Sequence, residues 1–260
     1  MDKVEYKCNE IQCRYEIGMQ SIIGERSEQQ DCIYARGDIE ECLLILCDGM
    51  GGFEGGSLAS RKAVDELIKI YDREQGIKDA DFLTYAMDVA DYAVSNIQNK
   101  ENESIRAGTT CVMVVINKNE VHWMSVGDSR LYIIRNKRIT QMTRDHTVEL
   151  KSRIEYADGK LTWQEFEDTL NERNALCSYL GINGIEIYDV NRQALNLKTN
   201  DILLLVSDGM YKSLKDDEIL HCVLQSKNMQ NAALRLVEEA TKIARGHNQD
   251  NTSVIICRIK

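Results

Sequence analysis

The 260-residue sequence contains no proline, and it has no Pro/Ser-rich linker, low-complexity tract or run of like charge. Such segments usually mark the boundary between domains, so we expect residues 1–260 to form a single domain. No apolar run approaches the length needed to cross a membrane. The first residues also lack the apolar segment of a secretion signal. We therefore expect a cytoplasmic protein that has no membrane partner.

Positive charge is scarce as well. The 32 Lys and Arg residues are outnumbered by 42 Asp and Glu residues, which gives a formal net charge of −10. No basic cluster with interleaved aromatic residues offsets this balance, so the sequence disfavours a nucleic-acid surface. An acidic balance suits a cation-binding site, although most of the surplus carboxylates are expected to be solvated surface groups.

Cysteine and histidine lack the spacings that mark disulfide frameworks or zinc sites. The nine cysteines include no C-x-x-C pair, and several lie within apolar runs, where a free thiol behaves as a small hydrophobic group. This distribution favours a reducing compartment. The four histidines are far apart and lack H-x-H or H-E-x-x-H spacing. A zinc site is therefore not expected.

One phrase of the sequence occurs twice. Residues 43–50 read LLILCDGM, and residues 203–210 read LLLVSDGM. An apolar run this short, bounded by Gly, predicts a strand that is buried on both faces. Asp48 and Asp208 would then lie where these strands leave the core. Two carboxylates presented in this way repel each other unless positive charge lies between them, so we expect them to share divalent metal ions.

The remaining pattern predicts helices in two places and strands elsewhere. Helical spacing predicts helices over 57–71, 79–98, 216–225 and 229–244. Further strands are predicted at 11–23, 32–35, 109–116, 121–126, 131–135, 138–142, 185–190 and 252–259, with hairpin turns at 117–119 and 136–137. Because regular βαβ alternation is absent, we expect an α+β fold in which antiparallel sheets lie between helices. Residues 147–178 are polar and weakly periodic, which predicts short helices outside the sheets.

Five acidic residues share one context, a strand end or a Gly-flanked turn: Asp31, Asp48, Asp128, Asp208 and Asp250. Oxygen ligands of this kind, with the Gly49 carbonyl as an addition, suit hard cations such as Mg²⁺ or Mn²⁺. Two such ions can activate a water and bind a phosphoryl oxygen, so a phosphate ester is the natural substrate. Arg26 is a fitting bidentate partner for phosphate oxygens. A single Asp-Gly is more often only a turn, but its recurrence in one strand context disfavours that interpretation.

The Gly-rich stretch after Asp48 does not fit a nucleotide-binding motif. Gly49 and Gly51 match the first two positions of G-x-G-x-x-G, but Glu54 stands at the third. No Gly-Lys-Ser/Thr follows, so the phosphate-binding loop of nucleotide hydrolases is absent too. We do not expect a nucleotide.

Several motifs follow one another in a recognisable order. They are Arg26 and Asp31, Asp48-Gly49-Met50-Gly51-Gly52, Ala107-Gly108-Thr109-Thr110, Val126-Gly127-Asp128-Ser129-Arg130, Asp145-His146, Leu180-Gly181, Ser207-Asp208-Gly209 and Asp250-Asn251. This series resembles the metal-dependent protein serine/threonine phosphatases of the 2C type, the PPM family. The similarity runs from about residue 13 to residue 257. Met after Asp-Gly, and residues 172–176 shortly before Leu180-Gly181, resemble the bacterial branch.

The resemblance implies a four-layer α-β-β-α sandwich in which two antiparallel sheets are flanked by helix pairs. It places a centre of two Mn²⁺ or Mg²⁺ ions at one end. Asp48 would bridge the ions, and Gly49 would lend its carbonyl to one of them. Asp208 and Asp250 would hold the other ion, and Asp31 would support the ligands. A third ion at Asp128 is left open.

The implied function is hydrolysis of phosphoserine and phosphothreonine in proteins, opposing a bacterial Ser/Thr kinase. Arg26 would hold the phosphoryl group while a metal-activated water attacks in line, so no Ser or Cys nucleophile is required. Residues 147–178 would form a flap beside the cleft. We expect the protein to act as a monomer.

Three positions depart from the family pattern. Phe53 replaces a His that is usual in bacterial relatives, Lys212 replaces an Asp found in members with a third metal, and Gln30 replaces a Glu found in some members. Phe53 and Lys212 favour a rival interpretation, a phosphatase-like regulator that binds phosphoproteins with little turnover. The complete set of core carboxylates opposes it. His146 is expected to hydrogen-bond within a loop rather than to catalyse.

Overall fold

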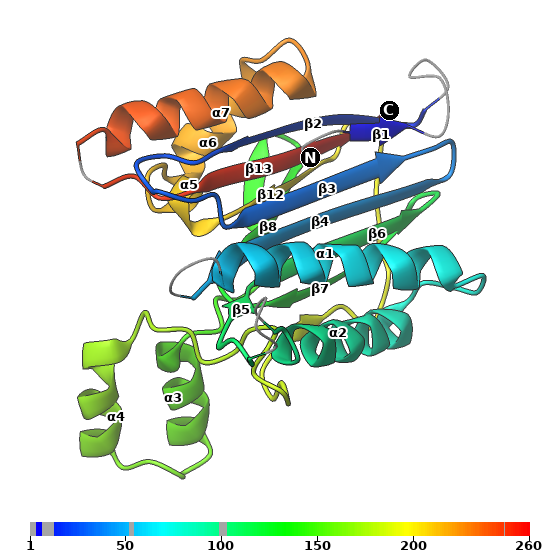
Figure 1. Ribbon diagram of the computed structural model, residues 1–260. Coiled ribbons are helices and arrows are strands. Elements are labelled where there is room, and N and C mark those ends of the chain that lie inside the picture. The colour runs from blue at the N-terminus through cyan, green and yellow to red at the C-terminus, as the bar shows by residue number, and fades with distance from the viewer. Residues whose placement is uncertain (1–3, 7–12, 52–54, 99–102, 247) are drawn as a thin grey trace.

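Two β-sheets pack face to face, and helices cover their outer faces (Figure 1). The structure is a computed structural model that describes residues 4–6, 13–51, 55–98, 103–246 and 248–260. The layers are helix pair, sheet, sheet and helix pair. The α+β sandwich predicted from the sequence is therefore confirmed.

The first sheet has the strand order β1-β3-β4-β6-β7-β10, with β5 paired to β4 and β11 paired to β7. Its strands are β1 (Val4–Tyr6), β3 (Asp31–Gly37), β4 (Glu41–Met50), β5 (Gly108–Thr109), β6 (Cys111–Asn117), β7 (Glu120–Val126), β10 (Asp189–Val190) and β11 (Leu195–Asn196). Every pairing is antiparallel except that of β1 with β3, which is parallel. This parallel edge was not predicted.

The second sheet has the order β2-β13-β12-β8-β9 and is antiparallel throughout. Its strands are β2 (Tyr15–Ile22), β8 (Arg130–Arg135), β9 (Arg138–Gln141), β12 (Ile202–Val206) and β13 (Thr252–Ile259). The hairpin between β8 and β9 turns at Asn136 (φ 52°) and Lys137 (φ 60°). Two consecutive residues with positive φ give the twist that a two-residue hairpin needs, as predicted.

The two copies of the repeated phrase form the central strands β4 and β12. In β4, Leu44 and Leu46 face the core between the sheets, whereas Leu43 and Ile45 face the covering helices. Strand β12 divides its residues in the same way between the inter-sheet core and its own helices. Burial on both faces explains why neither run alternates with polar residues.

Two helices cover each sheet. Helices α1 (Gly55–Arg73) and α2 (Ala80–Ser95) lie on the first sheet, and α6 (Asp216–Leu224) and α7 (Met229–Ala244) lie on the second, together with the short α5 (Asp208–Tyr211). Asp79 caps α2 by accepting the main-chain N–H groups of Asp81 and Phe82. Capping satisfies N–H groups that the first turn leaves unpaired. None of the described helices is both long and apolar enough to span a membrane.

The predicted strand at 185–190 is reduced to β10. The main-chain N–H groups of Gly181, Asn183 and Gly184 donate to the Asp91 carboxylate of α2, at 2.7, 3.2 and 2.8 Å. This segment is therefore held to a helix, and only Asp189 and Val190 reach the sheet edge. The predicted strand at 109–116 is interrupted at Thr110, and β2 begins at Tyr15; residues 11 and 12 lie outside the described residues.

Residues 147–178 contain α3 (Val148–Ala157), α4 (Trp163–Thr169) and a 3₁₀ turn, η1 (Leu170–Glu172). The two helices extend away from the sandwich (Figure 1) and pack on each other through Tyr156, Trp163 and Phe166, whose ring centroids are 5.5–5.7 Å apart. The base of this excursion is closed where Cys177 N–H donates to the His146 carbonyl at 3.0 Å.

Candidate metal centre

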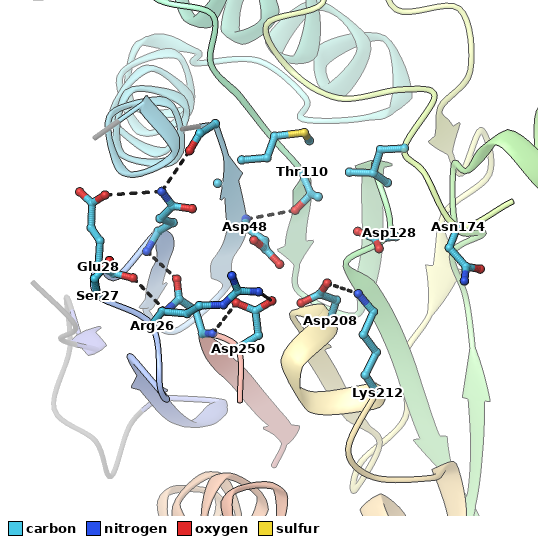
Figure 2. Close-up of a pocket in the computed structure, with 16 residues that line it drawn as sticks. Arg26, Ser27, Glu28, Asp48, Thr110, Asp128, Asn174, Asp208, Lys212 and Asp250 are labelled. Atoms are coloured by element: carbon cyan, nitrogen blue, oxygen red, sulfur yellow. Dashed lines mark hydrogen bonds and ion pairs between the residues drawn. The ribbon is translucent and has the colours of Figure 1, made fainter. Parts of the chain in front are cut away.

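A cleft of about 620 Å³ gathers residues that are far apart in the sequence. Its lining includes Arg26, Asp48, Gly49, Asp128, Asp208 and Asp250. Figure 2 shows the four aspartates directed toward one shared space from different segments. Asp31, the remaining predicted site residue, is buried behind them at 7% exposure. The structure thus brings the predicted residues together at one end of the sandwich.

Strand ends determine where the carboxylates lie. Asp31 and Asp48 stand opposite each other in the register of β3 and β4, within the first sheet. Asp208 begins α5 and lies two residues after the end of β12, and Asp250 lies two residues before β13. Asp128 precedes β8. The cleft therefore receives carboxylates from both sheets.

The Gly of each Asp-Gly pair permits a close approach of main chain rather than a turn. Neither Gly49 nor Gly209 has a positive φ. A Cβ atom at Gly49 would lie 2.1 Å from the Gly56 carbonyl oxygen in α1, and one at Gly209 would lie 2.2 Å from that of Asn251. Any larger residue would push these segments apart, so the repeated Gly has a steric cause at both positions.

Among the carboxyls of the site, Asp31 and Asp48 have the most strongly shifted pKa values. Asp31 accepts a hydrogen bond from Ser207 Oγ at 2.9 Å on Oδ2, but its buried Oδ1 has no partner in the described part of the chain. Burial, aided by the charge of Asp208, raises the pKa of Asp31 from 3.8 to about 7. Burial also raises the pKa of Asp48 well above its usual value, and the charges of Asp31, Asp208, Asp128 and Asp250 raise it further.

These shifts mean that the carboxyls resist ionising together. A divalent cation placed among them would remove that cost. The carboxylate donors are all oxygens, and one buried oxygen lacks a partner among the described residues, so the residues present fit Mg²⁺ or Mn²⁺ rather than zinc.

Two side-chain cations pair with the outer carboxylates. Arg26 Nη2 lies 2.7 Å from Asp250 Oδ2, and Lys212 Nζ contacts Asp208 Oδ2. Burial lowers the pKa of Lys212, but the charge of Asp208 and its neighbours outweighs this effect, so that the pKa is raised. Among the described residues, no three His, Cys, Asp or Glu side chains lie close enough together to hold a metal ion.

Asp128 is held by residues that the sequence did not single out as a group. Tyr211 Oη donates to Asp128 Oδ2 at 3.0 Å. The Arg130 guanidinium lies over the Tyr211 ring at 3.6 Å and is fixed by two hydrogen bonds to the Asp145 carboxylate, at 2.9 and 2.7 Å. Tyr211 could have been suspected from its place three residues after Asp208, almost one helical turn along α5.

His146 contacts the main chain of Gly127, the residue before Asp128. The His146 Nδ1 atom accepts a hydrogen bond from the Gly127 N–H at 3.1 Å, and the main-chain N–H of His146 donates to the Gly127 carbonyl at 3.0 Å. Gly127 has a φ of 96°, which favours glycine. The predicted role of His146, hydrogen bonding within a loop, agrees with these contacts.

Asn251 fixes the loop that carries Arg26. Its Oδ1 accepts the Gln30 N–H at 2.8 Å, and its Nδ2 donates to the carbonyls of Ile23 and Glu28 at 2.8 and 3.0 Å. Gln30 also lines the cleft, whereas Phe53 lies outside the described residues. Asn174 and Leu176, near the end of the 147–178 excursion, border the cleft as well.

Comparison with known proteins gives a consistent result. A model of the family "Protein phosphatase 2C" matches residues 12–249. The serine/threonine protein phosphatase PstP of Mycobacterium tuberculosis is 29% identical over 234 residues, which cover 90% of this chain and 43% of that protein. The chain thus spans less than half the length of this curated relative.

Solved structures of bacterial phosphatases are similar to this chain along almost its whole length. The crystal structure of the M. tuberculosis phosphatase PstP/Ppp is similar with a TM-score of 0.76 and 27% identity, covering 95% of this chain and 99% of that one. The catalytic domain of PstP in complex with two manganese ions is similar with a TM-score of 0.73 and 27% identity, covering 94% and 97%. The chain therefore belongs to the protein phosphatase 2C family of serine/threonine phosphatases.

Proposed function

We propose that this chain hydrolyses phosphoserine and phosphothreonine in proteins and depends on Mn²⁺ or Mg²⁺. The observation that carries the proposal is the convergence of Asp48, Asp128, Asp208 and Asp250 in one cleft beside Arg26. The family to which the chain belongs is metal-dependent, and a related catalytic domain holds two manganese ions.

Several of these residues would act as ligands of the ions. Asp48 and the Gly49 carbonyl, with Asp208 and Asp250, would bind two ions, and Asp31 would support Asp48 from behind. A third ion would require Asp128. When bound, the ions would lower the pKa of a water and neutralise charge on the phosphoryl group.

Arg26 would bind the phosphoryl oxygens. Its side chain is 48% exposed, and its guanidinium forms an ion pair with Asp250 at the wall of the cleft. A guanidinium binds phosphate through parallel N–H donors. If the Arg26 guanidinium released Asp250 and bound the substrate instead, the phosphate would lie beside the carboxylates that hold the ions.

No side chain needs to act as a covalent nucleophile. Cys47, which directly precedes Asp48, is fully buried, and burial raises the pKa of its thiol well above its usual value. A thiol in this state is a poor nucleophile. Direct attack by water on phosphorus is therefore the reaction that the cleft supports best.

The surrounding chain would serve this one site. We propose that residues 1–260 act as a single catalytic domain, and that residues 147–178 are a flap whose end borders the cleft at Asn174 and Leu176. We further propose that the enzyme acts as a monomer and opposes a bacterial Ser/Thr kinase.

A second candidate function is a phosphatase-like regulator that binds phosphoproteins with little turnover. The observation that favours it is the pairing of Lys212 with Asp208 and of Arg26 with Asp250, which engages two proposed metal ligands. Millimolar Mn²⁺ should displace both cations if the chain is an enzyme.

Hydrolysis assays separate the two functions. An aryl phosphate and a phosphothreonine peptide would be offered with Mn²⁺ or with EDTA. We expect Mn²⁺-dependent turnover of both that is abolished in Asp208→Asn and retained in Asp217→Asn, an exposed carboxylate of α6. Turnover that persists in EDTA would refute the metal dependence, and no turnover at millimolar Mn²⁺ in folded protein would refute the enzyme and favour the regulator.

A further inference from the structure

A second groove, of about 710 Å³, adjoins the metal cleft. Met50 and Gly51 line both the cleft and the groove, so the two lie side by side. Residues 104–108 and the segment that carries Tyr179 and Ile182 also line the groove. A polypeptide whose phosphoresidue lies in the cleft must continue in two directions, and this groove is an open path for one of them.

The groove differs from the cleft in charge. Four aspartates and Glu28 line the cleft, whereas no Asp or Glu is among the described residues that line the groove. Arg106 is the one cation among these described lining residues, and its side chain is exposed. In a chain of net charge −10, this is a local positive site beside the acidic centre.

Arg106 has no competing partner among the residues that the structure describes. Among the described residues, nothing forms a hydrogen bond or ion pair with it, in contrast to Arg26 and Lys212, which are paired with aspartates. An exposed guanidinium without an intramolecular carboxylate is free to bind a carboxylate of another chain. The structure therefore offers a cation for a substrate rather than for its own fold.

The main chain beside Arg106 is also open. Ile105 N–H donates to the Ile97 carbonyl at 3.1 Å, and Gly108 pairs with Met50 at the start of β5. Between these two points, the main chain of Arg106 makes no hydrogen bond with other described residues. Extended peptides bind such segments through their main chain, and neighbouring pockets read alternate side chains. Ile182, 39% exposed, gives the groove an apolar wall.

We propose that this groove binds the stretch of substrate polypeptide next to the phosphoresidue, and that Arg106 selects an acidic side chain in it. The inference rests on the proposed function, because it presupposes a phosphoprotein in the cleft. It adds the substrate class: phosphopeptides with Asp or Glu on one side of the phosphorylated residue.

The test uses a set of phosphothreonine peptides in which one Glu, or one Lys, is moved through five positions on each side of the phosphoresidue. kcat and KM are measured with Mn²⁺ for the unchanged protein, Arg106→Glu, Arg106→Gln and Arg138→Glu. Arg138 is an exposed arginine in β9 and serves as the matched control, because it lies near the end of β8 remote from Asp128. Hydrolysis of an aryl phosphate, which is too small to reach the groove, reports the metal centre alone.

We expect KM to be about three- to fivefold lower for Glu than for Lys at one or two neighbouring positions, in keeping with an exposed ion pair. Arg106→Glu should invert this preference, Arg106→Gln should remove it, and Arg138→Glu should leave it intact, with kcat and aryl phosphate turnover unchanged. Normal aryl phosphate turnover without any change of preference in Arg106→Glu would overturn the inference alone. Failure of the unchanged protein on both substrates would refute the proposed function and this inference with it.

Discussion

Replacing Asp31 by Asn should stabilise the metal-free protein, and most strongly at alkaline pH. Asp31 is 7% exposed, and its Oδ1 has no partner among the described residues. Burial, aided by the charge of Asp208, raises the pKa of this carboxyl from 3.8 to about 7. Asn has the same size but no charge, so the folded protein no longer has to bury an anion there.

The size of the effect follows from linkage. A carboxyl whose folded pKa is raised contributes stability that is fully present below pH 3.8 and is lost as the pH rises through 7. The folded and unfolded pKa values of Asp31 differ by about 3 units. At about 1.36 kcal/mol per unit, ionisation of Asp31 lowers the free energy of unfolding by about 4 kcal/mol in total. At pH 5 only about 2 kcal/mol of this stability has been lost. The advantage of Asp31→Asn should therefore grow by about 2 kcal/mol from pH 5 to pH 8.

Urea unfolding in EDTA at pH 5 and pH 8 measures this difference directly. Asp88→Asn, at an exposed carboxylate of α2, is the matched control and should follow the unchanged protein at both pH values. Mn²⁺ should reverse the order at pH 8, because the unchanged protein gains an ion that the variant holds less well. If Asp31→Asn showed the pH dependence of the unchanged protein, or were less stable at pH 8 in EDTA, the reasoning about this carboxyl would be wrong.

Three further changes test other contacts of the site. Arg26→Ala should raise KM for a phosphopeptide at least tenfold and change kcat less, since a charge-assisted hydrogen bond contributes about 1.5–3 kcal/mol; an unchanged KM would remove Arg26 from phosphate binding. Lys212→Met should raise Mn²⁺ affinity by up to about fivefold in calorimetry, because an exposed ammonium no longer competes for the metal ligands, and equal affinity would argue against competition. Tyr211→Phe should lower the free energy of unfolding by about 1 kcal/mol through the lost hydrogen bond to Asp128, whereas Tyr92→Phe at an exposed ring should not; equal stabilities would refute that role for Tyr211.

The sequence predicts much of this architecture because its strongest signals are local. The apolar runs that became β4 and β12 are short and bounded by Gly, and α7 occupies the predicted range 229–244. The site aspartates are recognisable for the same reason, since each lies at a strand end or in a Gly-flanked turn. That pattern needs no knowledge of how the sheets pack.

The features that were not predicted depend on contacts between distant segments. Asp91 of α2 holds the main chain at residues 181–184, which shortens the strand predicted at 185–190. Asn251 fixes a loop more than 200 residues earlier in the chain. Tyr211 reaches Asp128 only because the segments before β8 and after β12 lie side by side. No periodicity in the sequence encodes such pairs.

The division of the carboxylates between the two sheets has a mechanical consequence. Asp31 and Asp48 belong to neighbouring strands of one sheet, while Asp208 and Asp250 flank strands of the other. An ion bound by both groups would act as a cross-link between the layers, in addition to any part in the reaction. Loading with Mn²⁺ should then slow amide hydrogen exchange in β12 and β13 as well as in β4, although β4 pairs with neither of them in a sheet. The hairpin at residues 136–137, at the other end of the sandwich, should exchange as before.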